Sequence, residues 1–426
     1  MAEVSAVRSL SVPSDKSLSH RALMFAALAT GESELRGILP SADVMSTAGV
    51  LRHLGIDLPE RWQAGATLRI RGRGRRGLLA PSVSLDCGNS GTTTRLMAGV
   101  IAGHVMSATF IGDPSLSRRP MRRIARPLTQ MGAGFSFLAD DGLPMTVQGA
   151  DLRDVSWISP TASAQVKSAI LLAALVSGCS ARVQEPTRSR DHTERMLAAL
   201  GAPVIVTDDA VLLDPVDRLA PLDFAVPGDP SSALFLIASA VLRGQPLEVL
   251  NVGVNATRTG AFAVLRRMGV TLTLANERDA GGEPVADVHV APCAGLRGVV
   301  IGGDEIPALI DEIPMLACLA ARAEGETYIT DAAELRVKES DRISAVVSNL
   351  RSVGVEADEL PDGMVVRGTS SALTGQVVTH ADHRIAMSFG VLGALTGNRI
   401  LIDDLSCVDV SFPGFWSMLA EFGEGA

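Results

Sequence analysis

A pattern that recurs six times, at a period of about 70 residues, constrains the fold of this chain more than any other feature. In each copy a nearly all-apolar run ends at a glycine, and about 25 residues later a Leu-x-x-Φ-Gly pattern follows, in which Φ is apolar. The apolar runs are Arg21–Gly31, Thr94–Gly103, Lys167–Gly178, Ser232–Gly244, Ile313–Gly325 and Arg384–Gly397. The second patterns are Leu51–Gly55, Leu128–Gly132, Leu197–Gly201, Leu265–Gly269, Leu350–Gly354 and Leu419–Gly423. Two series with one period predict six copies of one structural unit.

Each copy predicts a buried helix, an amphipathic helix and a pair of strands. Glycine after an apolar run favours a helix end, because it adopts the left-handed conformation at little cost. The alternating stretch Val204–Leu213, and the turn sequences Asp140-Asp141-Gly142 and Pro361-Asp362-Gly363, indicate hairpins after the second glycine. Helices that are apolar all round must be covered on every side. We therefore expect a bundle of buried helices, with sheets and amphipathic helices around it.

The six copies group as three plus three. Val226-Pro227-Gly228-Asp229, at the midpoint, is a turn-rich boundary. We predict an α/β fold with two similar domains, residues 14–227 and residues 1–13 plus 228–426, and a cleft between them. The sixth copy ends without its hairpin, and we expect the leading segment Val7–Val12 to supply a strand missing there. One long solenoid is the alternative, and it is less favoured because such repeats usually span about 20–50 residues.

Composition excludes several classes of protein. The chain of 426 residues has a net charge of −9 and 4% aromatic residues, which argues against a nucleic-acid partner or an anionic membrane surface. No run approaches the length of about 18 apolar residues typical of a membrane span. The N-terminus shows no secretory signal. The five cysteines are far apart, without a C-x-x-C pair, so we expect no disulfide framework, no zinc site and a cytoplasmic location.

Cationic side chains stand where the buried helices are predicted to begin. They are Lys16, Arg21, Arg95, Lys167 and Arg384. Ordinary helix capping explains polar residues such as Thr92 and Ser231 at these places, but cations in a first turn oppose the helix dipole. Helix starts with added cations bind phosphate or carboxylate groups well. The sequence therefore predicts a ligand with several negative charges.

Two further charged clusters follow, at 117–123 and 336–342. The first carries four arginines, and charge runs of this kind are usually solvated. In the second, Lys338 and Arg342 are four residues apart, so on one helix they would share a face. That spacing predicts a forked clamp for an anion.

Seven segments, taken in order, resemble one enzyme family. They are PSDKSLSHRA, LDCGNSGTTTR, SRRPMRR, SAQVKSA, GDPSSA, RVKESDR and DHRIAMS. Together they resemble 5-enolpyruvylshikimate-3-phosphate synthase (3-phosphoshikimate 1-carboxyvinyltransferase), from Lys16 to Pro413. RPMRR, SAQVK and Asn255-Ala256-Thr257-Arg258 resemble the bacterial subgroup that includes members tolerant of the herbicide glyphosate.

The resemblance implies a fold and a reaction. The fold would have two domains, each with three βαβαββ units around buried parallel helices, an inside-out α/β barrel, and the active site in the interdomain cleft. The enzyme would transfer the enolpyruvyl group of phosphoenolpyruvate to the 5-hydroxyl of shikimate 3-phosphate and release phosphate, a step of aromatic amino-acid biosynthesis. It would need no metal and no organic cofactor, and a cytoplasmic monomer is expected.

The resemblance also assigns roles to residues. Asp311 would be the general base on the 5-hydroxyl, with Lys338 nearby, and Glu339 would transfer protons at the methylene carbon of phosphoenolpyruvate. Lys16 would touch both substrates. Shikimate 3-phosphate would be held by Lys16, Ser17, Arg21, Ser163, Ala164, Gln165, Arg190, Asp311 and Lys338. Phosphoenolpyruvate would be held by Lys16, Gly91, Arg119, Gln165, Arg342 and Arg384.

The chain departs from the family pattern at several positions. Ala164 stands where other members have Ser, and Glu334 where many have Asn. Val410 replaces a frequent Lys, so the phosphate site would be less cationic. Gly91 lies where tolerant members of the subgroup often carry Ala, whose methyl group crowds glyphosate. Gly91 therefore predicts a glyphosate-sensitive enzyme, although the subgroup motifs predict tolerance.

Three alternative functions remain to be compared. The related enolpyruvyl transferase that acts on UDP-N-acetylglucosamine typically uses a reactive Cys near Arg119, where this chain has Ser115 and Ser117. A non-catalytic anion-binding protein on the same scaffold would be favoured by lost carboxylates, yet Asp311 and Glu339 are both present. An RNA-end-processing enzyme on a similar repeat is disfavoured by the pI of about 5.4 and the scarcity of aromatic residues.

Overall fold

The computed structural model describes residues 7–424, and the chain in it divides into two compact units. The N-terminal unit comprises Ser14–Val226 and Asp279–Glu283, and the C-terminal unit comprises Met1–Pro13, Pro227–Arg278 and Pro284–Ala426. Each unit has its own hydrophobic core. None of the described helices has the length and apolar character of a membrane span.

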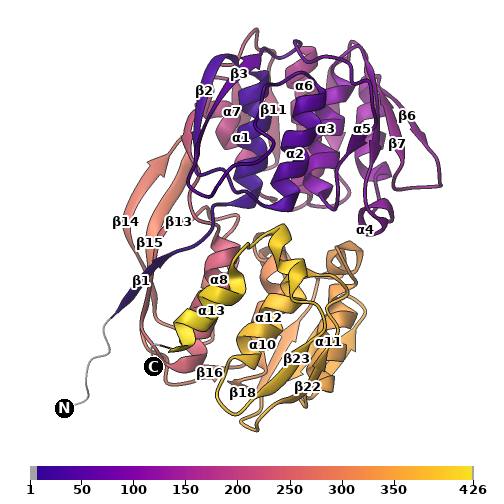
Figure 1. Cartoon of the computed structure of the whole chain (residues 1–426). Helices are drawn as coiled ribbons and strands as arrows, with labels where there is room; N and C mark the ends of the chain where they lie inside the picture. Colours follow the sequence, from indigo (N-terminus) through magenta and orange to yellow (C-terminus); the bar gives the residue numbers. More distant parts are fainter. Residues whose placement is uncertain (1–6, 425–426) are drawn as a thin grey trace. The chain divides into compact units, whose positions relative to one another are not determined.

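Three buried helices form the centre of the N-terminal unit (Figure 1). They are α1 (Lys16–Leu28), α3 (Gly91–Ala102) and α6 (Ala164–Ser177), and nearly all of their residues are buried. The outer helices are α2 (Ala42–His53), α5 (Arg122–Met131) and α7 (His192–Ala199), with the short α4 (Pro114–Ser117) before α5. Burial all round the central helices follows from their continuous apolar sequence.

Three sheets of one topology surround this bundle. Their strand orders are β12-β2-β3, β4-β5-β7-β6 and β8-β9-β11-β10. In each sheet the first two strands are parallel and the remaining pairs are antiparallel. The strands are β2 (Thr30–Arg36), β3 (Thr67–Arg73), β4 (Leu85–Asp86), β5 (Ser107–Ile111), β6 (Gly134–Phe137), β7 (Met145–Gln148), β8 (Val155–Ile158), β9 (Ala181–Gln184), β10 (Val204–Val206), β11 (Ala210–Leu213) and β12 (Asp223–Ala225).

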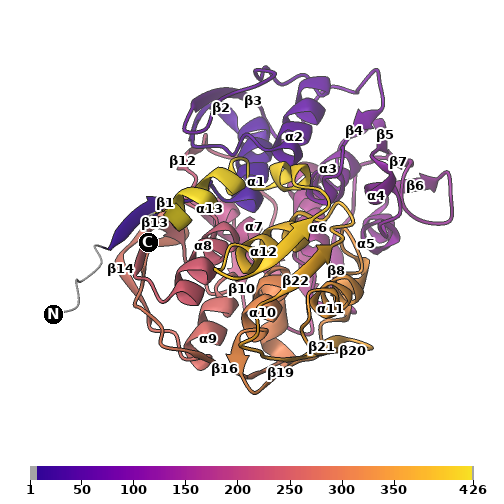
Figure 2. The same cartoon turned by 60° about the horizontal axis from the view of Figure 1, so that its bottom comes forward.

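The C-terminal unit repeats this plan, and Figure 2 shows it from a second direction. Its buried helices are α8 (Pro230–Arg243), α10 (Ile313–Ala320) and α12 (His383–Gly393). The others are α9 (Gly260–Arg267), α11 (Arg342–Ser352) and α13 (Phe415–Glu424). Four 3-10 turns connect elements: η1 (Gly303–Ala308), η2 (Ile310–Glu312), η3 (Ala333–Val337) and η4 (Ser406–Val410).

The sheets of the C-terminal unit are β1-β13-β15-β14, β17-β19-β21-β20, β16-β18 and β22-β23. Their strands are β1 (Arg8–Ser11), β13 (Leu247–Gly253), β14 (Leu272–Ala280), β15 (Glu283–Val290), β16 (Leu296–Arg297), β17 (Val300–Ile301), β18 (Ala323–Glu324), β19 (Glu326–Ile329), β20 (Ala357–Leu360), β21 (Gly363–Arg367), β22 (Thr374–Val377) and β23 (Arg399–Ile402). The α/β fold predicted from the repeat, with three copies in each unit, is confirmed.

The expected place of the leading strand is wrong. β1 pairs in parallel with β13, in the fourth copy, and the sheet of the sixth copy keeps only β22 and β23. The physical reason lies in the sheet topology: in the second, third and fifth copies the sheet begins with a parallel strand, β4, β8 or β17, from the segment before the buried helix. In the first copy β12 takes that place beside β2. Since β12 is used there, the fourth copy takes its leading strand from the N-terminal segment.

The two glycine series behave differently. In the Leu-x-x-Φ-Gly series, the first five glycines have positive φ and follow an outer helix. Of the apolar-run series, only Gly178 and Gly244 cap their helix in the left-handed conformation, with φ of 75° and 64°. Gly103 caps α3 in the right-handed conformation. The other three buried helices end three or more residues before the predicted glycine, and α10 already stops at Ala320, five residues before Gly325. In the fifth copy the residues after α10 form β18 instead.

Candidate active site

The predicted site residues lie in both units, at or near helix starts. Those of the N-terminal unit are Lys16, Ser17, Arg21, Gly91, Arg119, Ser163, Ala164, Gln165 and Arg190. Those of the C-terminal unit are Asp311, Lys338, Glu339, Arg342 and Arg384. Within the C-terminal unit, ion pairs join four of the five: Lys338 contacts Asp311, and Arg342 contacts both Asp311 and Glu339.

Arg342 is the centre of the charged group in the C-terminal unit. It is the first residue of α11, and its side chain is 1% exposed. Its guanidinium contacts three carboxylates: Asp382 at 2.8 Å, Glu339 at 2.7 Å and Asp311 at 3.3 Å. Burial by itself would lower the pKa of Arg342, but these carboxylates raise it above its ordinary value. The guanidinium is therefore a permanent cation, fixed in position by its partners.

Asp311 lies in η2 and presents a partly exposed carboxylate to two cations. Its Oδ1 is 3.3 Å from Nζ of Lys338 and 3.3 Å from Nη1 of Arg342. It does not cap the following helix α10, for which the cap is Glu312 without a side-chain hydrogen bond. A carboxylate held between an ammonium and a guanidinium, 14% exposed, is positioned to accept a proton from a bound hydroxyl.

Arg384 belongs to a second, adjoining network at the start of α12. Its guanidinium donates to the backbone oxygen of Asp311 at 2.6 Å and to Glu312 at 3.3 Å. Glu312 in turn accepts from the hydroxyl of Ser231, which accepts from Arg258 at 3.0 Å. The motif around Arg258 thus reaches the site through Ser231, a connection that the sequence did not reveal.

The predicted helical clamp is wrong in its geometry. Lys338 follows η3 in an extended conformation, whereas Arg342 begins α11. They share no helix, because Asp341 caps α11 and the helix cannot extend back to Lys338. Both side chains nevertheless meet at the same oxygen of Asp311.

Lys16 and Arg21 project from the first turns of α1. Lys16 contacts Asp43 at 2.9 Å and remains 19% exposed, and Ser17, beside it, is half-buried. Arg21 donates to the hydroxyls of Thr193 at 2.8 Å and Ser168 at 3.0 Å. Burial lowers the pKa of Arg21 to about 10, although Glu194 acts in the opposite direction. At pH 7 the guanidinium is still protonated, and these two hydrogen-bond partners are neutral.

Arg119 and Gln165 flank the start of α3. Arg119 donates to the side-chain oxygen of Asn89 at 2.6 Å, and Gln165 bridges Arg95 at 2.6 Å and Thr92 at 3.0 Å. Both arginines approach Gly91, the first residue of α3: a methyl group there would lie 3.0 Å from Arg95 and 3.4 Å from Arg119. In the same 117–123 cluster, Arg122 instead donates to the backbone oxygen of Asp140, at 2.6 Å.

Ser163, Ala164 and Arg190 stand around the start of α6. Ser163 caps the helix at Val166, and Ala164 is the first helical residue. The backbone N–H of Ser163 donates to Glu185 at 2.8 Å. Arg190 lies in the loop before α7, and its charge contributes to lowering the pKa of Arg21. These residues and Arg21 therefore form one cationic region of the N-terminal unit.

Lys167 is not available to a ligand. Its side chain is 2% exposed and contacts Glu185 and Glu194, each at 2.8 Å. Glu185, Glu194 and Thr193 were not singled out from the sequence, and no role was given to Ser168, Asn89 and Asp382, which stand in its polar segments at helix starts. A lysine inside a continuous apolar helix was the one available signal, because a buried ammonium requires acidic partners.

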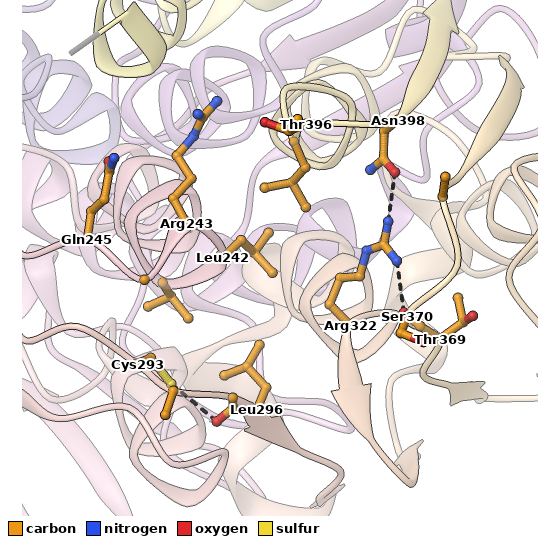
Figure 3. A pocket seen from close by; sticks show the side chains of 16 residues that line it. Leu242, Arg243, Gln245, Cys293, Leu296, Arg322, Thr369, Ser370, Thr396 and Asn398 are labelled. Carbon is orange, nitrogen blue, oxygen red and sulfur yellow. Dashed lines mark hydrogen bonds between the residues drawn. The ribbon is translucent and has the colours of Figure 1, made fainter. Parts of the chain in front are cut away.

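A cavity of about 600 Å³ in the C-terminal unit is lined by none of these residues (Figure 3). It is lined by the end of α8, by the segment that follows α12 and by residues such as Cys293 and Arg322. Arg384 stands at the opposite end of α12. Among the described residues no cluster of His, Cys, Asp and Glu could hold a metal ion.

Comparison with known proteins gives one consistent result. A family profile described as EPSP synthase (3-phosphoshikimate 1-carboxyvinyltransferase) matches residues 4–419. A 3-phosphoshikimate 1-carboxyvinyltransferase from Herpetosiphon aurantiacus is 46% identical over 97% of this chain and 96% of its own, and one from Pelotomaculum thermopropionicum is 48% identical over 97% and 95%.

Solved structures agree. EPSP synthase from Acinetobacter baumannii is 39% identical, with a TM-score of 0.83 over 97% of this chain and 95% of that one. The enolpyruvyl transferase NikO from Streptomyces tendae, at 18% identity and a TM-score of 0.77 over 99% and 95%, shares the fold. The chain belongs to the EPSP synthase (3-phosphoshikimate 1-carboxyvinyltransferase) family.

Proposed function

We propose that this chain transfers the enolpyruvyl group of phosphoenolpyruvate to the 5-hydroxyl of shikimate 3-phosphate and releases phosphate. The family supports this reaction. The observation that carries it is the arrangement at Asp311: a partly exposed carboxylate between Lys338 and the buried Arg342. A base next to fixed cations suits a reaction in which a hydroxyl attacks a polyanionic substrate.

The substrates are assigned to residues on the same basis. Shikimate 3-phosphate is bound by Lys16, Ser17, Arg21, Ser163, Ala164, Gln165, Arg190, Asp311 and Lys338, with Ala164 contributing only its backbone. Phosphoenolpyruvate is bound by Lys16, Gly91, Arg119, Gln165, Arg342 and Arg384. Support comes from the buried, protonated guanidiniums of Arg21 and Arg342, which are suited to phosphate and carboxylate groups.

The chemistry divides among the carboxylates and the cations. Asp311 accepts the proton of the 5-hydroxyl while the oxygen of that hydroxyl attacks C2 of phosphoenolpyruvate. Glu339 delivers a proton to the methylene carbon and later removes one, when the C–O bond to phosphate breaks. Its contact with Arg342 at 2.7 Å keeps it directed toward the cationic centre. Arg342, Arg384 and Lys16 stabilise the negative charge that develops on the leaving phosphate.

The remaining expectations complete the proposal. The reaction requires no metal ion and no organic cofactor, because the residues above supply the proton transfers and the charge stabilisation. We expect the chain to act as a cytoplasmic monomer on small-molecule substrates, with no nucleic-acid or membrane partner.

Product analysis tests the reaction directly. With phosphoenolpyruvate and shikimate 3-phosphate, mass spectrometry should detect shikimate 3-phosphate enlarged by one enolpyruvyl group. With UDP-N-acetylglucosamine as the acceptor, no product should form. Product only from the nucleotide sugar would replace the proposal with the alternative transferase.

Arg21→Ala should weaken the binding of shikimate 3-phosphate by about tenfold to a hundredfold, because a buried charge-assisted hydrogen bond contributes roughly 1.5–3 kcal/mol. The KM for phosphoenolpyruvate and kcat should change little. Isothermal titration with shikimate 3-phosphate and steady-state kinetics measure the three quantities. An unchanged dissociation constant would remove Arg21 from the binding site.

Gly91→Ala tests the assignment of phosphoenolpyruvate and of glyphosate. The new methyl group would lie 3.0 Å from Arg95, whose guanidinium must shift by a few tenths of an ångström, and it would touch Arg119 at 3.4 Å. We expect glyphosate to raise the apparent KM for phosphoenolpyruvate in the wild-type enzyme and to do so much less in the variant. The variant should itself bind phosphoenolpyruvate several-fold more weakly, while its affinity for shikimate 3-phosphate is unchanged. An apparent KM unaffected by millimolar glyphosate in the wild type would contradict the expected sensitivity.

A further inference from the structure

A buried ionic network lies next to the cationic region of the N-terminal unit, which consists of Ser163, Ala164, Arg190 and Arg21. It consists of Lys167 on α6, Glu185 directly after β9 and Glu194 on α7, whose side chains are 2%, 7% and 3% exposed. Burial by itself would lower the pKa of Lys167, but the two glutamates raise it, so the ammonium remains charged. Burial raises the pKa of Glu194. An ammonium this deeply buried needs an acidic partner, yet here it has two.

The two glutamates connect Lys167 to different parts of the unit. Glu194 ties it to α7, next to Thr193. Glu185 ties it to the loop between β9 and α7, where both carboxylate oxygens accept from the hydroxyl of Ser189, at 2.8 and 2.7 Å. One oxygen of Glu185 also accepts from the backbone N–H of Ser163, at 2.8 Å. Glu185 therefore joins the start of α6 to the loop that carries Arg190.

A parallel connection runs through the neighbouring residues. Ser168 follows Lys167 on α6, and Thr193 precedes Glu194 on α7; their hydroxyls are 2.7 Å apart. Both accept from Arg21 of α1. Three residues assigned to shikimate 3-phosphate are thus connected to this network. Ser163 donates to Glu185, Arg190 follows Ser189 in the sequence, and Arg21 donates to the neighbours of Lys167 and Glu194.

We propose that Glu185, with Lys167 as its counter-ion, is a positioning residue for shikimate 3-phosphate. Its carboxylate holds Ser163 at the start of α6 and Ser189, beside Arg190, in the relative position that the substrate requires. Glu185 does not contact the substrate. It acts through Ser163 and Ser189, which donate hydrogen bonds to its carboxylate. The inference rests on the proposed function, because that function assigns Ser163 and Arg190 to shikimate 3-phosphate.

Glu185→Gln is the decisive variant. The amide has the same shape, but its NH₂ group cannot accept a hydrogen bond, so it must face either the ammonium of Lys167 or the N–H of Ser163. The dissociation constant for shikimate 3-phosphate, measured by isothermal titration, should rise about tenfold. The KM for phosphoenolpyruvate and kcat at saturating shikimate 3-phosphate should stay within about twofold. Glu185→Asp, which keeps the charge but not the reach, should fall between the wild type and Glu185→Gln.

Glu283→Gln is the matched control. Glu283 is also a buried carboxylate of the N-terminal unit, 2% exposed, and it contacts α7 through His192 at 2.8 Å. Ser163 and Ser189 donate to Glu185, whereas the charge of Glu283 acts on Arg21 and opposes the lowering of its pKa by burial. Replacing Glu283 should lower the melting temperature, and it should weaken the binding of shikimate 3-phosphate much less than Glu185→Gln does.

The outcomes separate the two proposals. If Glu185→Gln lowers the melting temperature as the control does but leaves the dissociation constant unchanged, Glu185 has only a structural role and the inference is wrong. If the wild-type protein binds shikimate 3-phosphate but forms no product, the proposed reaction fails, while the titrations still decide the role of Glu185. If the wild-type protein does not bind shikimate 3-phosphate, both proposals are wrong.

Discussion

Asp311→Asn is expected to lower kcat by about a hundredfold to ten-thousandfold, the usual contribution of a positioned general base. The amide can still accept hydrogen bonds from Lys338 and Arg342, which now stand 3.3 Å from the carboxylate, but it cannot take a proton. The loss should therefore fall on the transition state, with kcat and kcat/KM reduced together. Steady-state kinetics at saturating concentrations of both substrates give the measurement.

The comparison with Arg21→Ala makes this test specific. Arg21 is assigned to binding, so its variant should lose affinity and keep kcat. Asp311→Asn should keep its affinity for shikimate 3-phosphate, which isothermal titration measures without turnover. If both variants lost only affinity, Asp311 would be a binding residue and not the base.

Asp382→Ala is expected to lower the free energy of unfolding by about 3–5 kcal/mol, the cost of removing one partner of a buried ion pair. Asp382 is fully buried and contacts Arg342 at 2.8 Å. It also caps α12, where it accepts from the backbone N–H of Arg384 at 3.0 Å. The substitution leaves the buried guanidinium with less compensation and the helix start without its cap. Urea unfolding at pH 7 measures the loss.

Asp358→Ala is the control for this prediction. Asp358 also contacts an arginine, Arg367 at 2.7 Å, but its side chain is 52% exposed. Exposed pairs contribute about 0–1 kcal/mol, so this variant should unfold almost like the wild type. Equal losses in the two variants would show that burial does not determine the energy of these pairs.

The carboxylate of Asp382 also predicts how the free energy of unfolding depends on pH. Burial by itself would raise the pKa of Asp382, but Arg342 holds it below its ordinary value. Its stabilising contribution is therefore complete above the pKa of an unfolded aspartate, about 3.9, and is lost as the pH falls through the lower pKa of the folded state. Below about pH 4 the wild type should lose stability more steeply than Asp382→Ala. Parallel curves would mean that Asp382 titrates alike in both states.

Local sequence predicted the repeated elements well, because the signals are local. An apolar run can only be a buried helix, and the glycine of Leu-x-x-Φ-Gly does follow an outer helix with positive φ in the first five copies. The leading strand was placed in the second domain but not beside β13, since nothing in Arg8–Ser11 indicates a partner more than 200 residues away. The early end of α10 at Ala320 was also missed, because the first glycine after the run is Gly325, five residues further on.

The candidate site was predicted in part for the same reason. Cations in first turns are visible in the sequence, and Lys16 and Arg384 do stand in the first turns of α1 and α12, whereas Arg21 lies one turn further along α1. Whether such a cation is open to a ligand depends on distant residues: Lys167 is enclosed by Glu185 and Glu194, which come from other elements. The meeting of Lys338 and Arg342 at Asp311 likewise depends on tertiary structure and not on helical spacing.

Release of phosphate from phosphoenolpyruvate, with and without shikimate 3-phosphate, tests the central claim most directly. The account predicts release that depends strictly on shikimate 3-phosphate and that nearly disappears in Asp311→Asn. Saturable binding of shikimate 3-phosphate without any release would contradict it and indicate a binding protein, or a phosphate site made inactive by Val410. Release at the same rate without shikimate 3-phosphate would contradict the proposed acceptor.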